Sequence, residues 1–343
     1  MNFNRLNKTI ALIVFLIAFV VVYSTAQPSV SFWDCGEFIA SAFYLQVTHP
    51  PGAPVFLILG RLFSMIPLAS NIAFRVNIIS IITSALSILF LYLIIVKVIE
   101  NYKGKKPENL IDALGTYIAA AIGALAFAFS DTFWFNGVEA EVYASSTFLF
   151  GAITWLMMQW NDRADFKDSE KYILMIAFLI GVATGVHLMS VLAIVPVVMI
   201  IVFRKYMEDE AACKKTGYIF LAHVGVILVI AFAMWGAQTS KTPPTQTQYQ
   251  DYDTKFKLIA LAISAVIMGT FWRKIFSRNS FYLPLIIGGA ALFIVYPGVV
   301  KNLPEFMTLI GENNIIIEVL ILVIIFAALG YGTYYAVKEI EIA

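Results

Sequence analysis

Residues 9–54 read TIALIVFLIAFVVVYSTAQPSVSFWDCGEFIASAFYLQVTHPPGAP, an apolar run followed by a polar segment that is rich in motifs. Arg5 and Lys8 precede the run from Thr9 to Tyr23, and the small residues at 24–26 resemble a cleavage site, so the start of the chain has the pattern of a signal peptide. Because the chain continues with further apolar runs, we interpret this one as an uncleaved first membrane span. The polar residues after it then begin the first outer loop.

The composition excludes most soluble classes of protein. Hydrophobic residues make up 60% of the 343 positions and charged residues 13%, about half of the ~25% that is usual in soluble domains. The net charge of +1 comes from 23 basic and 22 acidic residues, which leaves no electrostatic signature for a nucleic-acid partner. These figures exclude a soluble globular enzyme, a disordered chain and a nucleic-acid binder. They predict a single integral-membrane domain over 1–343, embedded in a lipid bilayer, with no sizeable soluble domain.

The distribution of Lys and Arg orients the predicted spans. Ten apolar runs approach the length of ~20 residues that a spanning helix needs. With the N-terminus in the cytoplasm, 17 of the 23 basic residues fall inside and 6 outside, as the positive-inside rule requires. Counting the short run 54–66 as a span would invert every later loop and destroy this bias. We therefore predict an all-α polytopic protein with about ten transmembrane helices and with 54–66 as a re-entrant or interfacial helix in the first outer loop, 25–75.

The first outer loop contains two carboxylates three residues apart, in the stretch SFWDCGE at 31–37. An Asp-x-x-Glu sequence before an apolar segment is a helix capping box, with Asp34 as the N-cap and Glu37 at the third position. The same pair beside Trp33 is also a candidate for catalysis. Both readings stay open on the spacing alone, since one carboxylate oxygen can cap the helix while the other faces a cavity.

Further polar residues follow at three predicted outer positions. His49 lies in the rigid turn THPPG at 48–52, where its role is either structural or functional. In VEAEVY at 138–143, Glu139 and Glu141 fall in the first turn of the next helix, where the helix dipole favours anions. Residues two apart do not share a helix face, so we expect at most one of the two to face a cavity.

Cationic candidates for binding a phosphate are few. Arg61 and Arg75 are the basic residues of the first outer region, and either could hold a phosphate, which arginine binds well. Arg61 could instead extend its charge to lipid headgroups. His187 lies at the outer end of an apolar hairpin, as a structural or a functional residue.

Several of these motifs together resemble a known family. WDCGEF at 33–38 and HPPGAP at 49–54 are similar to the N-terminal part of a bacterial inner-membrane family, long described as a domain of unknown function and related to a eukaryotic endoplasmic-reticulum protein O-mannosyltransferase. VEAEVY at 138–143 and GVHL at 185–188 match its later motifs. The resemblance covers roughly residues 5–205. It implies a GT-C-like glycosyltransferase fold with two membrane-surface helices in the first outer loop, which fits 36–47 and 54–66.

The resemblance also implies an activity. The donor would be a sugar, mannose or another hexose, on a polyprenyl phosphate, and the acceptor a Ser/Thr hydroxyl of a protein or a glycan hydroxyl on the outer face of the bacterial inner membrane. Asp34 would be the general base, with Glu37 beside it. The remaining candidates are Arg61, Arg75 and His187 for the donor phosphate and His49, Glu139, Glu141 and Tyr143 for the substrate cavity.

Other expectations concern cofactors, chain length and rival functions. No cofactor is predicted, and a divalent metal is left open. Many members of the family continue with a further span and a large outer C-terminal domain, whereas this chain stops at Ala343, as a shorter or a truncated member would. The alternatives are a polytopic transporter or flippase for a lipid-linked or small-molecule substrate, and a scaffold protein whose acidic motifs only cap helices.

Overall fold

The computed structural model describes residues 3–238, 245–294, 302–311 and 314–342, together with Tyr296 and Gly298, and this part of the chain is helical without a strand. It divides into two compact units, 1–289 and 290–343, each considered by itself. The predicted single domain stays a prediction. The helices are α1 Phe3–Thr25, α2 Cys35–Tyr44, α3 Pro54–Met65, α4 Ile72–Lys103, α5 Leu110–Ala128, α6 Asp131–Gly137, α7 Val142–Arg163, α8 Glu170–Thr184, the 3₁₀ helix η1 Leu188–Ala193, α9 Ile194–Tyr206, α10 Glu210–Gln238, α11 Gln246–Thr270, α12 Trp272–Ile275, α13 Tyr282–Phe293, α14 Leu303–Gly311 and α15 Ile315–Ile342.

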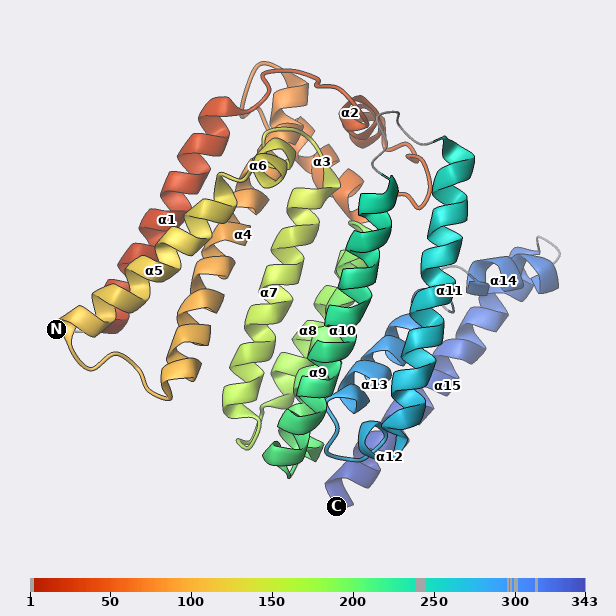
Figure 1. Ribbon diagram of the computed structural model, residues 1–343. Helices are drawn as coiled ribbons and strands as arrows, with labels where there is room; N and C mark the ends of the chain where they lie inside the picture. The colour runs from red at the N-terminus through yellow and green to blue at the C-terminus, as the bar shows by residue number, and fades with distance from the viewer. Residues whose placement is uncertain are drawn as a thin grey trace. The chain divides into compact units, whose positions relative to one another are not determined.

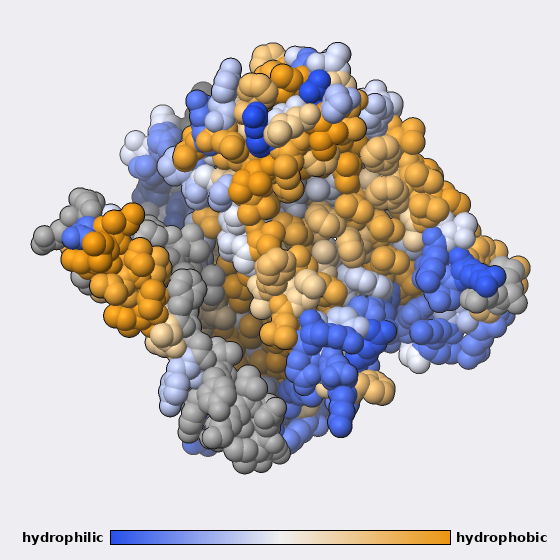
Figure 2. Space-filling view, turned by 180° about the vertical axis from the view of Figure 1, so that it is seen from behind, coloured by the Kyte–Doolittle hydropathy of each residue, from blue (hydrophilic) through white to orange (hydrophobic). Residues whose placement is uncertain are grey.

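Five helical segments of the described chain are long and apolar enough to cross a membrane, which confirms a multi-pass membrane protein in its broad form. They are α1, α4, α5, the continuous segment Leu188–Tyr206 and Glu210–Met234 within α10. The total of about ten spans stays a prediction. On the rear face of the structure, hydrophobic residues form a broad band and hydrophilic residues gather mainly below it (Figure 2).

The segment 25–75, which the sequence predicts to be the first outer loop, contains two short helices, as expected. At about 1.5 Å per residue, the 12 residues of α3 extend only about 18 Å, which is too short for a hydrocarbon core of about 30 Å. Both α2 and α3 lie at the end of the bundle where α1 ends and α4 begins (Figure 1). They approach each other closely at Gly60, where an added Cβ would lie 2.6 Å from the Cβ of Ala42.

α4 is the central helix of the N-terminal part, because it packs against α1, α3, α5 and α7. One stripe of α4 is polar although the helix is apolar overall. Asn77, Ser80, Ser84 and Ser87 are all buried and recur at helical spacing on one face. Ser80 of this polar stripe meets the second acidic motif in the loop before α7. Asn77 donates to the carbonyls of Gln27 and Ser29 in the loop after α1.

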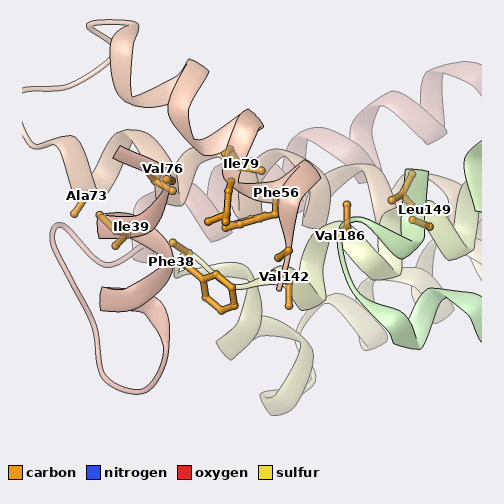
Figure 3. Close-up of a cluster of buried hydrophobic side chains, with 14 residues drawn as sticks. Phe38, Ile39, Phe56, Ala73, Val76, Ile79, Val142, Leu149 and Val186 are labelled. Carbon is orange, nitrogen blue, oxygen red and sulfur yellow. The ribbon is translucent and has the colours of Figure 1, made fainter. Parts of the chain in front are cut away.

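A hydrophobic cluster under the first outer loop joins α2, α3, α4 and α7 (Figure 3). Phe56 is fully buried at its centre and meets the ring of Phe38 edge to face, with 5.6 Å between the ring centroids. Val142 and Val186 belong to the same cluster. Three of these core residues adjoin a polar candidate in the sequence: Phe38 follows Glu37, Val142 follows Glu141, and Val186 precedes His187. The cluster therefore fixes the backbone on which the candidate site is built.

Candidate functional site

Three segments that are distant in the sequence line one small cavity of about 40 Å³, which we call the acidic pocket. The lining residues that carry polar chemistry are Asp34, Thr48, His49, Glu141, Tyr143 and His187. The first segment contributes the start of α2 and the turn before α3, the second the start of α7, and the third the loop after α8. The structure thus brings together most of the residues selected from the sequence.

Asp34 is the N-cap residue of α2, but within the described chain its side chain makes no capping hydrogen bond. Its backbone carbonyl accepts the first helical bond from the N–H of Phe38, at 2.9 Å. The preceding residue, Trp33, has φ 62°, a left-handed conformation that is unusual for a bulky side chain. Its indole is 83% exposed. The capping box is therefore not formed, and the Asp34 carboxylate is left to face the pocket.

Glu37 binds His49 instead of the helix terminus. Its Oε1 accepts from the backbone N–H of His49 at 2.6 Å, and its Oε2 lies 2.8 Å from Nδ1 of the same residue. These hydrogen bonds hold the pKa of Glu37 below its ordinary value and raise the pKa of His49 above its own. Glu37 therefore orients His49 and favours the charged form of the imidazole at the pocket.

Glu139 and Glu141 lie in the loop before α7 and not in its first turn, so that part of the prediction was wrong. Both are buried, and Glu141 lines the acidic pocket whereas Glu139 does not. The backbone of Glu141 is fixed by Ser80 of the polar stripe, whose Oγ donates to the carbonyl of Glu141 at 3.2 Å and accepts from its N–H at 3.3 Å. Burial raises the pKa of the Glu141 carboxyl to about 7, and the thiol of Cys35, 3.5 Å from Oε1, counteracts part of that shift. Near neutral pH, this carboxyl is therefore present as a mixture of its protonated and ionised forms.

Cys35 and Ser80 belong to the site although the sequence analysis did not select them. Cys35 is fully buried, and burial together with the nearby glutamates raises the pKa of its thiol to about 12. The signal that would have identified Ser80 is the helical spacing of polar residues in an otherwise apolar span. No comparable signal distinguishes Cys35, because its role depends on the loop before α7, more than 100 residues away.

His187 is the N-cap of η1 and lies beside Tyr143, with 5.1 Å between the ring centroids. Its Nδ1 accepts a hydrogen bond from the N–H of Met189 at 3.1 Å. Burial lowers the pKa of His187, which favours the neutral ring. A neutral ring that accepts at Nδ1 carries its proton on Nε2, so His187 offers one N–H donor.

Arg61 and Arg75 lie outside the acidic pocket and bind backbone carbonyls. Arg61 Nη1 donates to the carbonyl of Phe43 at the end of α2, at 2.5 Å, and its guanidinium lies over the ring of the same residue. Arg75 donates from Nε to the carbonyl of Ala69 at 2.6 Å and from Nη1 to that of Ser64 at 3.0 Å. Both side chains join elements of the first outer loop, and their predicted role in phosphate binding stays a prediction.

Two groups of side chains in the described residues have ligand atoms close enough together to hold a metal ion. One consists of Asp34, Glu37 and His49 and the other of Cys35, Glu139 and Glu141, with the atoms of each group within 4.8 Å of one another. In the first group, Glu37 and His49 already bind each other. In the second, the Cys35 thiol has to lose its proton to bind a metal, because metals bind the thiolate. The two buried glutamates are the better oxygen donors for a divalent cation.

Comparisons with known proteins identify the family of the region that contains this pocket. The family described as "Protein O-mannosyl-transferase TMEM260 N-terminal domain" matches residues 34–210, which contain every residue of the acidic pocket. A protein O-mannosyl-transferase tmem260 of Dictyostelium discoideum is 31% identical over 176 residues, 50% of this chain and 19% of the relative. A protein O-mannosyl-transferase TMEM260 of Mus musculus is 26% identical over 178 residues, 52% of this chain and 23% of the relative.

The matched region spans only about a fifth of the length of these curated relatives. No solved structure matches the chain. The family model nevertheless covers just over half of the chain, from Asp34 at the start of the first acidic motif to the beginning of α10. The chain therefore belongs to the family of the N-terminal domain of the protein O-mannosyl-transferase TMEM260.

Proposed function

We propose that this protein is a membrane glycosyltransferase that moves mannose or another hexose from a polyprenyl-phosphate donor to a hydroxyl of a protein Ser/Thr or of a glycan. The observation that carries the proposal is the convergence of Asp34, His49, Glu141 and His187 on one pocket, within the region matched by the family. The names of the two relatives support the same class of enzyme.

In the proposed reaction, the acceptor oxygen attacks the anomeric carbon of the sugar while the bond from that carbon to the phosphate oxygen breaks. The bonding electrons leave with the polyprenyl phosphate, and the hydroxyl proton passes to Asp34. Asp34 suits this role because its carboxylate faces the pocket without a capping bond. A general base of this kind contributes typically 10²–10⁴-fold to the rate. Attack from the side opposite the phosphate inverts the anomeric centre.

The two histidines of the pocket are placed to stabilise the departing phosphate. The hydrogen bond from Glu37 raises the pKa of His49 and so favours its charged form, and His187 offers a neutral N–H donor. Fixed donors and charges aimed at developing negative charge are an effective means of lowering a barrier. Arg61 and Arg75 remain secondary candidates, because their guanidinium groups already bind carbonyls.

An apolar groove beside the acidic pocket supports a lipid-linked donor. Leu45, Val47, Leu57 and Ile58 line this groove of about 360 Å³, and it shares Thr48, Pro51, Gly52 and Ala53 with the acidic pocket. A polyprenyl chain in the groove would present its phosphate at the residues common to both cavities. A nucleotide-sugar donor has no hydrocarbon chain that could occupy such a groove.

The rest of the proposal concerns architecture and location. We assign the chain to the GT-C type of fold, with about ten spans, a cytoplasmic N-terminus and the acidic pocket on the outer face of a bacterial inner membrane. The excess of basic residues in the predicted inner loops supports this orientation. The position of α2 and α3 at one end of the bundle supports a membrane-surface site (Figure 1).

A cell-free transfer assay tests the proposal. Membranes from a strain that lacks the native gene supply the acceptors, the full chain is added, and radiolabelled mannose is offered either on polyprenyl phosphate or on GDP. We expect label to enter protein or glycan from the lipid-linked donor and not from the nucleotide sugar. Movement of lipid-linked sugar across sealed vesicles without any transfer would contradict the proposal and favour a flippase.

A further inference from the structure

A further cavity, of about 730 Å³, lies at the opposite end of the bundle from the acidic pocket and the apolar groove. Its floor is one face of α4, formed by Leu86, Leu89, Leu93, Lys97 and Glu100. Its walls are α1 and α7, which both pack against α4. We call this cavity the basic groove. Figure 1 shows that the N-terminal end of α1 and the C-terminal ends of α4 and α7 lie toward the same end of this unit.

All three helices change from apolar to charged in the same direction along the groove. α4 passes from Leu86, Leu89 and Leu93 to Lys97 and Glu100. On the two walls, the lining residues pass from Phe15 and Leu12 to Lys8 on α1, and from Trp155 through Gln159 to Arg163 on α7. The groove thus has an apolar half toward the middle of the helices and a polar half at their ends.

The polar half has an excess of positive charge. Four cations and two carboxylates line this half of the groove. One cation and one carboxylate neutralise each other, because Lys97 forms an ion pair with Asp162. The Arg163 guanidinium lies over the ring of Tyr172. Among the described residues, Lys8 and Lys106 have no carboxylate within ion-pair distance, although the charge of Lys106 interacts with that of Glu100 at longer range. Both ammonium groups line the groove, and neither is neutralised by a direct ion pair.

We infer that the basic groove binds an anionic glycerophospholipid, with its phosphate between Lys8 and Lys106 and an acyl chain along Leu12, Phe15 and Leu89. A ligand that is anionic at one end and a hydrocarbon at the other matches the groove in both halves. Basic sites between membrane helices on the cytoplasmic side are suited to anionic headgroups, and the excess of Lys and Arg predicts that this end is cytoplasmic.

This lipid is distinct from the proposed sugar donor. From Lys8 to Thr25, α1 rises about 26 Å at 1.5 Å per residue, so the basic groove and the acidic pocket lie on opposite sides of the hydrocarbon core. The inference therefore stands independently of the proposed transfer reaction, and its test requires no activity.

The test measures the thermal stability of the full chain in detergent as dioleoyl phosphatidylglycerol or dioleoyl phosphatidylcholine is added. A ligand that binds the folded protein and not the unfolded chain raises Tm, and the rise grows with the logarithm of its concentration above Kd. We expect the anionic lipid to raise Tm at concentrations where the zwitterionic lipid does not. Lys8→Gln combined with Lys106→Gln should weaken the apparent affinity for phosphatidylglycerol by roughly tenfold or more, because two charges near the phosphate are lost.

The matched control is Lys105→Gln combined with Lys167→Gln, which removes two charges from the same end of the bundle and leaves the groove lining intact. This pair should keep the affinity of the wild type. An equal loss in both double variants, or equal stabilisation by both lipids, would overturn the inference. So would an equal stabilisation by inorganic phosphate, which would show an anion site without a lipid.

A third variant tests the hydrocarbon half of the groove. Leu12 is 55% exposed on the wall formed by α1, so Leu12→Trp narrows the groove without disturbing the core. We expect it to weaken phosphatidylglycerol binding in the same Tm titration and to leave Tm without lipid nearly unchanged. Unaltered lipid affinity in this variant would remove the acyl chain from the groove and contradict the assignment of a phospholipid.

Discussion

Asp34, Glu37 and Glu141 have the same functional group and three different surroundings. Glu37 accepts two hydrogen bonds from His49, Glu141 is buried against Cys35, and Asp34 faces the pocket. The sequence placed the two acidic motifs on the same predicted side of the membrane, but spacing could not distinguish a cap from a base. The distinction depends on His49 and Cys35, whose contacts form only when separate segments fold together.

The pair of Glu37 and His49 makes a prediction about pH. The raised pKa of His49 means that its contribution to stability is complete below pH 6.5 and is lost as pH rises through the folded-state pKa. The lowered pKa of Glu37 means that its contribution is complete above pH 4.5 and is lost as pH falls through its folded-state value. The pair therefore stabilises the fold most between about pH 4.5 and 6.5.

The direct measurement is an NMR titration of the histidine rings, with the His49 signal assigned from a His49→Asn variant. We expect His49 to titrate above 6.5 in the wild type and to return toward 6.5 in Glu37→Gln. His187 should titrate below 6.5 in both proteins and serve as the internal control, because its lowered pKa is caused by burial and not by Glu37. A His49 pKa that does not respond to Glu37→Gln would contradict the geometry of the pair.

At the scale of helices, the short elements of the first outer loop were predictable and their junction was not. α3 spans Pro54–Met65, close to the predicted 54–66. In contrast, α2 spans Cys35–Tyr44 and ends three residues before the predicted 36–47, because Leu45 adopts a left-handed conformation. The close approach of these helices depends on Gly60 opposite Ala42, a pair of small residues that periodicity does not identify. The polar stripe of α4 was visible in the sequence, but its partner, the loop carrying Glu141, was not.

Gly60→Ala tests this junction. The new Cβ would lie 2.6 Å from the Cβ of Ala42, so α2 and α3 must separate. We expect a loss of about 1–3 kcal/mol of stability, as in other overpacked cores, measured by thermal or denaturant unfolding. Gly115→Ala in α5 is the matched control, because its Cβ meets nothing within 4 Å, and it should stabilise by up to about 1 kcal/mol. Equal Tm values for both variants would count against the close contact.

Arg75→Gln separates a structural role from phosphate binding. The Arg75 guanidinium joins the end of α3 to the start of α4 through the carbonyls of Ser64 and Ala69. Loss of these charge-assisted bonds should lower stability by about 1–3 kcal/mol, measured by unfolding. If Arg75 also binds the donor, the KM for lipid-linked sugar rises in the same variant. An unchanged KM with reduced stability would remove Arg75 from the donor site.

At the scale of the whole chain, composition predicted a multi-pass helical membrane protein, and the five long apolar helices confirm that class. The exact number of spans could not be read from hydropathy, because α7, α8, α11 and α13 are either short or moderately polar. Helices of this kind depend on their neighbours in the bundle for burial, and a hydropathy window takes no account of neighbours.

Orientation is testable by labelling from outside the cell. Native Cys35 is fully buried, so new cysteines at exposed positions are required, in a background without Cys213. Val47→Cys lies in the first outer loop and Tyr102→Cys at the end of α4, and both native side chains are about 90% exposed. A membrane-impermeant maleimide on intact cells should label the first and spare the second. The reverse pattern would place the acidic pocket in the cytoplasm.

The central claim is that the Asp34 carboxylate acts as the base, and the most direct measurement is kcat for sugar transfer by Asp34→Asn. Asn keeps the size of the side chain and loses the ability to take a proton, and no capping bond of the Asp34 side chain to α2 is formed that could be lost. We predict that kcat falls by roughly 10²-fold or more while Tm stays unchanged. The control variant Asp131→Asn alters an exposed acid of α6 outside the pocket and should keep full activity. Full activity of Asp34→Asn would contradict the account and make Glu141 the leading candidate for the base.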